Sequence, residues 1–125
     1  MKHLLVVDDQ SKDLLAAVQV AESLGFEDIH AKNSAWSARE YLEKGLSGEI
    51  PLPDAIVLDL DMGIESGFEL LRLWHSTPQL AGIPIMIWSV VENHEELCQL
   101  FKVNSFVSKW QGMDAFRDSL AKLVS

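Results

Sequence analysis

Three acidic residues stand directly after apolar stretches of the kind that form buried strands. Asp8 and Asp9 follow Leu4–Val7, and Asp59 follows Ala55–Leu58. If both stretches are parallel strands of one sheet, their carboxyl ends lie at the same edge, where open α/β folds bind ligands. Three carboxylates within about 5 Å repel one another by about 3 kcal/mol per pair at an effective dielectric of about 20. A hard divalent cation would offset that repulsion, and Mg²⁺ suits a site of few carboxylates, waters and a phosphate.

A hydroxyl and an amine follow two further apolar stretches. Ser89 comes directly after Ile85–Trp88, and Lys109 closely follows Ser105–Val107. An ionised aspartate can attack phosphorus to form an aspartyl phosphate, and this transfer depends mainly on positioning and on neutralising charge. Asp59 is the candidate nucleophile, and Lys109 is a point charge suited to a phosphoryl oxygen. Ser89 could donate its hydroxyl to the phosphoryl group once formed, while the acid pair after the first strand holds the metal ion.

Each of these residues has an ordinary explanation when it is taken alone. An acid after a strand often caps the next helix or faces solvent, and a lone serine or lysine is usually a turn or surface residue. Their joint placement at four strand ends favours one shared site over five separate coincidences.

The chain as a whole alternates strand-like and helix-like stretches. The predicted strands are Leu4–Val7, Glu27–Ala31, Ala55–Leu58, Ile85–Trp88 and Ser105–Val107. The predicted helices begin near Ser11 (with Gly25 ending it), Ser34, Ser66 and Asn93, and the last carries Phe116, Leu120 and Leu123. Capping boxes are predicted for Ser66 with Glu69 and for Asn93 with Glu96. This alternation predicts an α/β fold, a single doubly wound five-stranded parallel sheet in (βα)5 order with right-handed crossovers.

Length and composition limit the class of protein. The 125 residues, 48% of them apolar, suit a single domain over residues 1–125 with no output domain. The 19 acidic and 10 basic residues give a net charge of −9, which argues against nucleic-acid binding. Cys98 is the only cysteine, so no internal disulfide forms. No apolar stretch approaches about 18 residues and the N-terminus does not resemble a signal peptide, so a cytoplasmic protein without membrane contact is expected.

The polar pattern resembles the receiver domain of two-component response regulators, which has the CheY-like, flavodoxin-like fold. The resemblance covers the whole chain and implies the strand order 2-1-3-4-5. The residues that carry it are Asp8-Asp9 after the first strand, Asp59 placed 30 residues before Ser89, Met62 and Gly67 three and eight residues past Asp59, and Phe106 three before Lys109.

The resemblance implies a phosphorylation switch. A histidine kinase or a phosphotransfer protein would pass its phosphoryl group to Asp59, with Lys109 and Ser89 as the other catalytic residues. The groups that would hold Mg²⁺ are Asp8, mostly through a bound water, Asp9, Asp59 and the main-chain carbonyl of Asp61. No enzyme activity is expected beyond self-phosphorylation from phosphodonors and slow autodephosphorylation.

The resemblance also implies how the signal leaves the molecule. Ser89 would be drawn toward the phosphoryl group, and Phe106 would rotate into the space that it vacates. This would remodel the face made by the fourth helix, the fifth strand and the fifth helix, which would contact an unidentified downstream protein or a second copy of the chain. Trp110, beside that face, is a candidate interface anchor because exposed aromatic side chains bury large areas in protein contacts.

Three residues depart from the family pattern. Trp110 follows Lys109 where proline is usual, so the lysine loop is expected to be built differently. Gly63 replaces a usual proline and should loosen the loop after Asp59. Val90 stands after the switch serine where alanine or glycine is usual, and its branched side chain should narrow the phosphoryl entrance and slow labelling by small donors.

Within the family, Leu80–Pro84 and Asn104–Lys109 look closest to single-domain regulators that pair with bacterial phytochrome-type kinases. Two other functions stay open. Leu58–Asp61 resembles the DxD signature of haloacid-dehalogenase-type phosphatases, although that motif normally lies early in a longer chain. A receiver-like module that signals without phosphate is the second alternative. An FMN site is disfavoured because Asp8 and Asp9 would repel a phosphate rather than bind it.

The remaining aromatic side chains and imidazoles are assigned no chemistry. Three tryptophans fall on helical stripes or in a strand and are expected to pack in or near the core: Trp36, Trp74 and Trp88. The four histidines share no obvious spacing or strand end, so no zinc site is expected from His3, His30, His75 and His94.

Overall fold

The computed structural model describes residues 2–62, 67–90 and 94–125, and its centre is a five-stranded parallel sheet. The strands are β1 (His3–Val7), β2 (Asp28–Lys32), β3 (Ala55–Leu58), β4 (Ile85–Ser89) and β5 (Ser105–Ser108). Their order across the sheet is β2-β1-β3-β4-β5, which confirms the predicted strand order and fold class.

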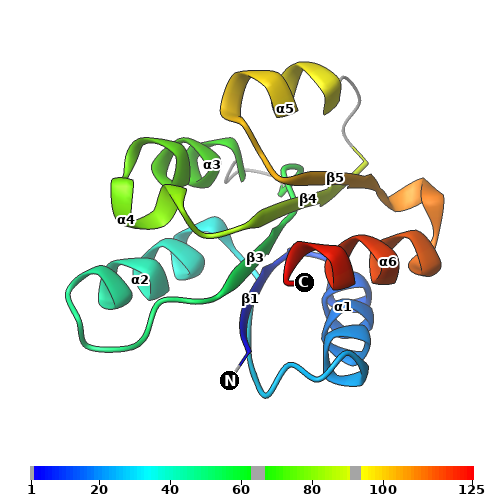
Figure 1. The fold of residues 1–125 in the computed structure, drawn as a ribbon, viewed down its shortest axis with the longest axis horizontal. Coiled ribbons are helices and arrows are strands. Elements are labelled where there is room, and N and C mark those ends of the chain that lie inside the picture. Colours follow the sequence, from blue (N-terminus) through cyan, green and yellow to red (C-terminus); the bar gives the residue numbers. More distant parts are fainter. Residues whose placement is uncertain (1, 63–66, 91–93) are drawn as a thin grey trace.

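Helices cover both faces of the sheet (Figure 1). They are α1 (Ser11–Ser23), α2 (Ala35–Leu46), α3 (Gly67–Ser76), α4 (Pro78–Ala81), α5 (His94–Phe101) and α6 (Met113–Leu123), with a 3₁₀ turn η1 (Lys109–Gln111) before α6. The sequence predicted five helices, and the two additions are short. Pro78 starts α4 at a position where proline is favoured, and Ser108 caps η1.

The central strands are buried on both faces, which explains why their sequences are continuous apolar runs. Alternate side chains, such as Leu5 and Leu58, pack against α2 and α3. The intervening ones, such as Leu4 and Val57, pack against α1 and α6. The edge strand β2 is only partly buried, and its sequence pattern is correspondingly weaker.

Local signals at the helix ends mostly act as predicted. The Ser34 hydroxyl accepts a hydrogen bond from the Ser37 amide at 3.1 Å and caps α2. Gly25 adopts φ +93° directly after α1, a conformation that glycine reaches without steric cost. Two predicted capping residues, Ser66 and Asn93, and the proline replacement at Gly63 lie outside the described residues.

One predicted packing position is wrong. Trp36 is 66% exposed because it lies in the first turn of α2, about 200° around the helix from Ala38, which contacts the sheet. Trp74 and Trp88 are buried as expected.

Within residues 2–62, 67–90 and 94–125, none of the helices has the length and apolar character needed to cross a bilayer.

Candidate functional site

The carboxylates gather where β1 and β3 end. Val7 and Leu58 are paired in register, so the acids that follow them are neighbours at one edge of the sheet. Asp8 and Asp59 are nearly fully buried, at 1% and 2% exposure. One ligand oxygen from each of Asp8, Asp9 and Asp59 lies within 4.8 Å of the others, so the predicted acidic cluster exists.

Asp59 is held by donors from three directions. Its Oδ1 accepts hydrogen bonds from the buried Ser89 hydroxyl at 2.7 Å and from the Asp61 amide at 3.1 Å. Its Oδ2 accepts one from the Lys109 ammonium at 3.4 Å. Ser89 reaches Asp59 because β4 lies next to β3, and Lys109 does so because it follows β5, the next strand along.

Lys109 is shared among three acids. Its Nζ lies 2.8 Å from Asp8 Oδ2 and 2.8 Å from Asp13 Oδ2, closer than to Asp59. Burial alone would lower the pKa of Lys109, but the hydrogen bonds to Asp13 and Asp8, with the charge of Asp59, outweigh it and raise the pKa. The ammonium is therefore charged throughout the physiological range.

Asp13 is the site residue that the sequence interpretation missed. It lies in the first turn of α1, the helix that starts at the acidic end of β1. An acid placed one helical turn past the strand end was the available signal, but its contact with Lys109 depends on side-chain geometry that spacing does not fix.

Asp8 carries the electrostatic cost of the cluster. Burial raises its pKa to about 6, and the charge of Asp59 adds to this rise. The hydrogen bonds from Lys109 and from the Gln10 amide, at 2.9 Å, only partly oppose the effect. Near neutral pH, Asp8 therefore holds its proton more tightly than an exposed aspartate does.

The donor set fits a divalent cation. Asp9 Oδ1 is buried and has no hydrogen-bond partner within the part of the chain that the structure describes. A buried polar atom without a partner is costly, and an ion would satisfy it. The three carboxylates supply only hard oxygen ligands, the type that Mg²⁺ prefers.

Gly67 allows α3 to start close beneath Asp59. A Cβ atom at this position would lie 2.3 Å from the Asp59 carbonyl oxygen and 2.8 Å from Leu60 Cα. No side chain fits there without a shift of the main chain. The glycine eight residues past Asp59 therefore fixes the approach of α3 to the site.

A cleft of about 270 Å³ opens beside Asp59. It is lined by Gln10, Asp13, Asp59, Asp61, Val90 and Lys109. Val90 is 37% exposed and forms part of this wall. The Val90 side chain therefore lies where it could narrow the entrance to Asp59, as predicted. Its effect on the rate of labelling by small phosphodonors stays a prediction.

The predicted switch and output residues lie near β5. Phe106 pairs in register with Ile87 and packs partly buried against the α2 and α3 side of the core. Trp110 is 83% exposed. It lies in η1, where the Ser108 hydroxyl accepts a hydrogen bond from its amide at 3.2 Å. The lysine loop is a 3₁₀ turn capped by Ser108. No cis peptide bond occurs among the described residues.

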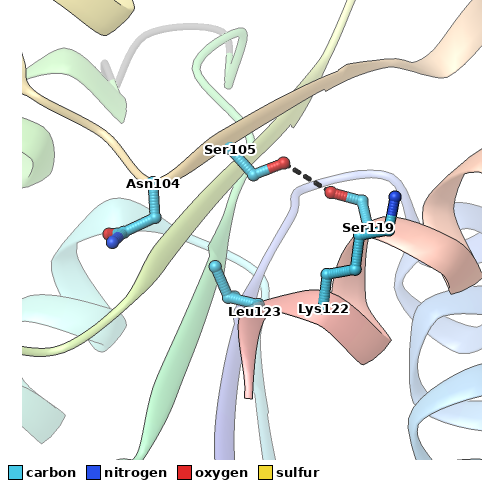
Figure 2. Close-up of a pocket in the computed structure, with 5 residues that line it drawn as sticks. All are labelled: Asn104, Ser105, Ser119, Lys122 and Leu123. Atoms are coloured by element: carbon cyan, nitrogen blue, oxygen red, sulfur yellow. Dashed lines mark hydrogen bonds between the residues drawn. The ribbon is translucent and has the colours of Figure 1, made fainter. Parts of the chain in front are cut away.

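A second, larger pocket lies between the amino end of β5 and α6, and it does not belong to this site. Its lining residues are Asn104, Ser105, Ser119, Lys122 and Leu123 (Figure 2), and its volume is about 310 Å³. Its serines hydrogen-bond to each other, and the Asn104 side chain accepts a main-chain hydrogen bond at the start of β4. These hydrogen bonds tie the start of β4 to the residue before β5, and the start of β5 to α6.

Comparison with known proteins supports the same fold. The Mn²⁺-bound form of response regulator Rcp1 is 20% identical, with a TM-score of 0.81 over 98% of this chain and 91% of that one. Chemotaxis response regulator CheY4 of Vibrio cholerae is 18% identical, with a TM-score of 0.78 over 98% of each chain. The phosphorylated cyanobacterial phytochrome response regulator RcpA is 25% identical, with a TM-score of 0.75 over 98% and 88%. No protein-family model and no curated protein matches the sequence.

Proposed function

We propose that this chain, which has the fold of response-regulator receiver domains, is a phosphorylation switch of a two-component system with Asp59 as the phosphoacceptor. The observation that carries the proposal is the environment of Asp59. A buried carboxylate, bonded to Ser89 and Lys109 beside two further acids, opens onto a cleft. The phosphorylated form of RcpA, a solved structure of the same fold, supports this chemistry.

The reaction requires a nucleophile and charge neutralisation. A carboxylate oxygen of Asp59 attacks the phosphorus of a phosphohistidine on a kinase or phosphotransfer protein. The new P–O bond forms as the P–N bond breaks, and the leaving imidazole takes up a proton. Lys109 stabilises the negative charge on the transferred oxygens, and the Ser89 hydroxyl, 2.7 Å from Asp59, is placed to donate to the product.

Asp8, Asp9 and Asp59 would hold a divalent cation, with the Asp61 carbonyl as the further predicted ligand. The ion would supply positive charge next to the phosphoryl oxygens. Mg²⁺ is our proposal for it, and the Mn²⁺-bound form of Rcp1, a protein of the same fold, supports the binding of a divalent ion. Asp8 must release its proton to contribute fully, and its pKa of about 6 allows this at neutral pH.

The output follows from the contacts of Ser89. Once phosphorylated, Asp59 would draw the hydroxyl away from its present bond, and Phe106 would turn inward next to Ile87. The face made by α5, β5 and α6 would then bind a downstream protein, or a second copy, with the exposed Trp110 as an anchor. A phytochrome-type histidine kinase is the phosphodonor that the sequence resemblance and the fold of RcpA support best.

Phosphorylation by acetyl phosphate and Mg²⁺ tests the proposal. Intact-mass analysis should show one added phosphoryl group on the wild type and none on Asp59→Asn. Asp61→Asn is the matched control, because its side chain is exposed and its main-chain carbonyl is retained. Equal labelling of Asp59→Asn would refute the proposal. Continuous turnover of a phosphate monoester would instead support a phosphatase of the haloacid-dehalogenase type, and failure of all variants to label would support a phosphate-independent module.

A further inference from the structure

A second polar cluster lies at the other end of the strands, near the amino ends of β1 and β2. It consists of His3 on β1, Asp28 and His30 on β2, and Tyr41 on α2. The parallel register pairs His3 with Asp28 and Leu5 with His30. Because side chains two apart on a strand share a face, Asp28 and His30 both point to the side that α2 covers. This cluster is separated from the Asp59 site by the length of β1, about 16 Å.

The nitrogen and oxygen atoms of the cluster converge. His30 Nε2 lies 2.8 Å from Asp28 Oδ1, and His3 Nε2 lies 3.9 Å from Asp28 Oδ2. One ligand atom from each of these three residues lies within 4.8 Å of the other two. The Tyr41 hydroxyl lies 2.5 Å from His3 Nε2 and is the fourth polar group of the cluster.

We propose that His3, Asp28 and His30 form a binding site for Zn²⁺ or a chemically similar borderline cation. Two imidazoles and one carboxylate are a ligand set that such ions prefer, and they leave a fourth position for water. The ligand atoms of a tetrahedral zinc ion lie about 3.3 Å apart, given bonds of about 2.0–2.1 Å. The imidazoles contact different Asp28 oxygens, at 2.8 and 3.9 Å, and all three ligand atoms lie within 4.8 Å of one another, so side-chain movements must bring them around one ion.

The surroundings provide both rigidity and access. The His3 side chain is 6% exposed, and its main-chain amide donates to Asp54 Oδ2 at 2.8 Å, which fixes the first strand residue. The Asp28 and His30 side chains are 42% and 37% exposed, so an ion can enter from solvent. Tyr41 packs edge-on to the His3 ring, and its hydroxyl hydrogen-bonds to His3 Nε2. An ion bound at Nε2 would displace this bond and leave the hydroxyl beside a metal-bound water.

The two metal sites would differ in the ion they select. The Asp59 site offers only carboxylate oxygens, which suit Mg²⁺. The His3 site offers imidazole nitrogens, which Mg²⁺ binds poorly and Zn²⁺ binds well. Sequence spacing predicted no zinc site because His3 and His30 are far apart in sequence, and only the register of β1 with β2 brings them together.

Calorimetric titration with Zn²⁺ in saturating Mg²⁺ tests this site separately from phosphorylation. Chelator-treated wild type should bind one Zn²⁺. His30→Gln and Asp28→Asn should each weaken binding by more than about 100-fold, since losing a ligand costs more than losing an outer-shell partner. His75→Gln, an exposed histidine on α3, and Asp59→Asn should bind as the wild type does.

A spectroscopic measurement separates a formed site from loose surface binding. Co²⁺ in place of Zn²⁺ should show the visible absorption of tetrahedral coordination in the wild type and lose it in His30→Gln, whose far-UV circular dichroism should be unchanged. Zn²⁺ binding that survives both ligand substitutions, that disappears in Asp59→Asn, or that gives no tetrahedral Co²⁺ spectrum would overturn the assignment.

Discussion

At the scale of single residues, the site is organised by competition for Lys109. Three carboxylates face one ammonium, and the proposed phosphoacceptor Asp59 is the most distant of them, at 3.4 Å. Asp13, whose Oδ2 lies 2.8 Å from Lys109 Nζ, lines the same cleft as Asp59. Under the proposed function, an incoming phosphoryl group would have to compete with Asp8 and Asp13 for Lys109.

Removing the Asp13 charge should speed phosphorylation. In Asp13→Asn, Lys109 becomes available to the incoming phosphoryl group, and one like-charge contact in the cleft is lost. Labelling by acetyl phosphate should rise about tenfold, which corresponds to about 1.4 kcal/mol in the barrier. Glu43→Gln, which removes an exposed charge from α2, controls for net charge and should leave the rate unchanged. A slower Asp13→Asn protein would mean that Asp13 positions Lys109 instead of diverting it.

Replacing Asp8 should stabilise the protein when no divalent cation is present. Its pKa is about 6 in the folded state and 3.8 in the reference state, so the folded protein binds more protons between these values. Stability from this group is therefore present below about pH 4 and is lost as the pH rises toward 6. At pH 7, Asp8→Asn should raise the free energy of unfolding by about 2 kcal/mol.

Urea unfolding of the wild type and Asp8→Asn at pH 7 and pH 4, in a chelator, measures the difference in their free energies of unfolding. This difference should be smaller at pH 4 than at pH 7, and added Mg²⁺ should stabilise the wild type more than the variant. A difference that is constant with pH would show that the Asp8 charge is not its source.

At the scale of elements, strand ends and one glycine decide where the site forms. The four strand ends were predictable because buried strands are short apolar runs bounded by polar residues. The alternation of strands with helices predicted a parallel sheet, and the family resemblance implied the strand order. The turns α4 and η1 were not predictable in this way, since each depends on local capping at Pro78 or Ser108. The ion pair between Asp13 and Lys109 depends on tertiary geometry, which a residue pattern does not contain.

Gly67→Ala should damage both stability and phosphorylation. The new Cβ would lie 2.3 Å from the Asp59 carbonyl oxygen, so α3 or the loop after β3 must shift. A cost of about 1–3 kcal/mol in the free energy of unfolding is expected from such overpacking. Gly82→Ala is the matched control, because a Cβ there meets nothing within 4 Å and φ is −80°. Thermal unfolding of both proteins decides, and equal melting temperatures would contradict the role given to Gly67.

Shortening Val90 should widen the entrance to Asp59. The side chain lines the cleft at the end of β4, so Val90→Ala should be labelled several-fold faster by acetyl phosphate. Pseudo-first-order rates from intact mass at several donor concentrations measure the effect. Equal rates would rule out steric narrowing at this position.

At the scale of the whole molecule, polar clusters lie at both ends of the parallel strands, with an apolar core between them. The cluster at the carboxyl ends combines Asp8, Asp9 and Asp59 with Lys109, and the cluster near the amino ends combines His3, Asp28 and His30. The first was predictable from sequence, because Asp8 and Asp9 come directly after one buried strand and Asp59 after another. The second was not, because it required knowing which residues of β1 and β2 face each other.

Mapping the phosphorylated residue is the decisive experiment for Asp59 as the phosphoacceptor. After reaction with acetyl phosphate and Mg²⁺, borohydride reduces an aspartyl phosphate to homoserine, and peptide mass spectrometry then locates the modified residue. We predict homoserine at position 59 alone. Homoserine at position 8, 9 or 13, or modification of a histidine without any at position 59, would contradict the account.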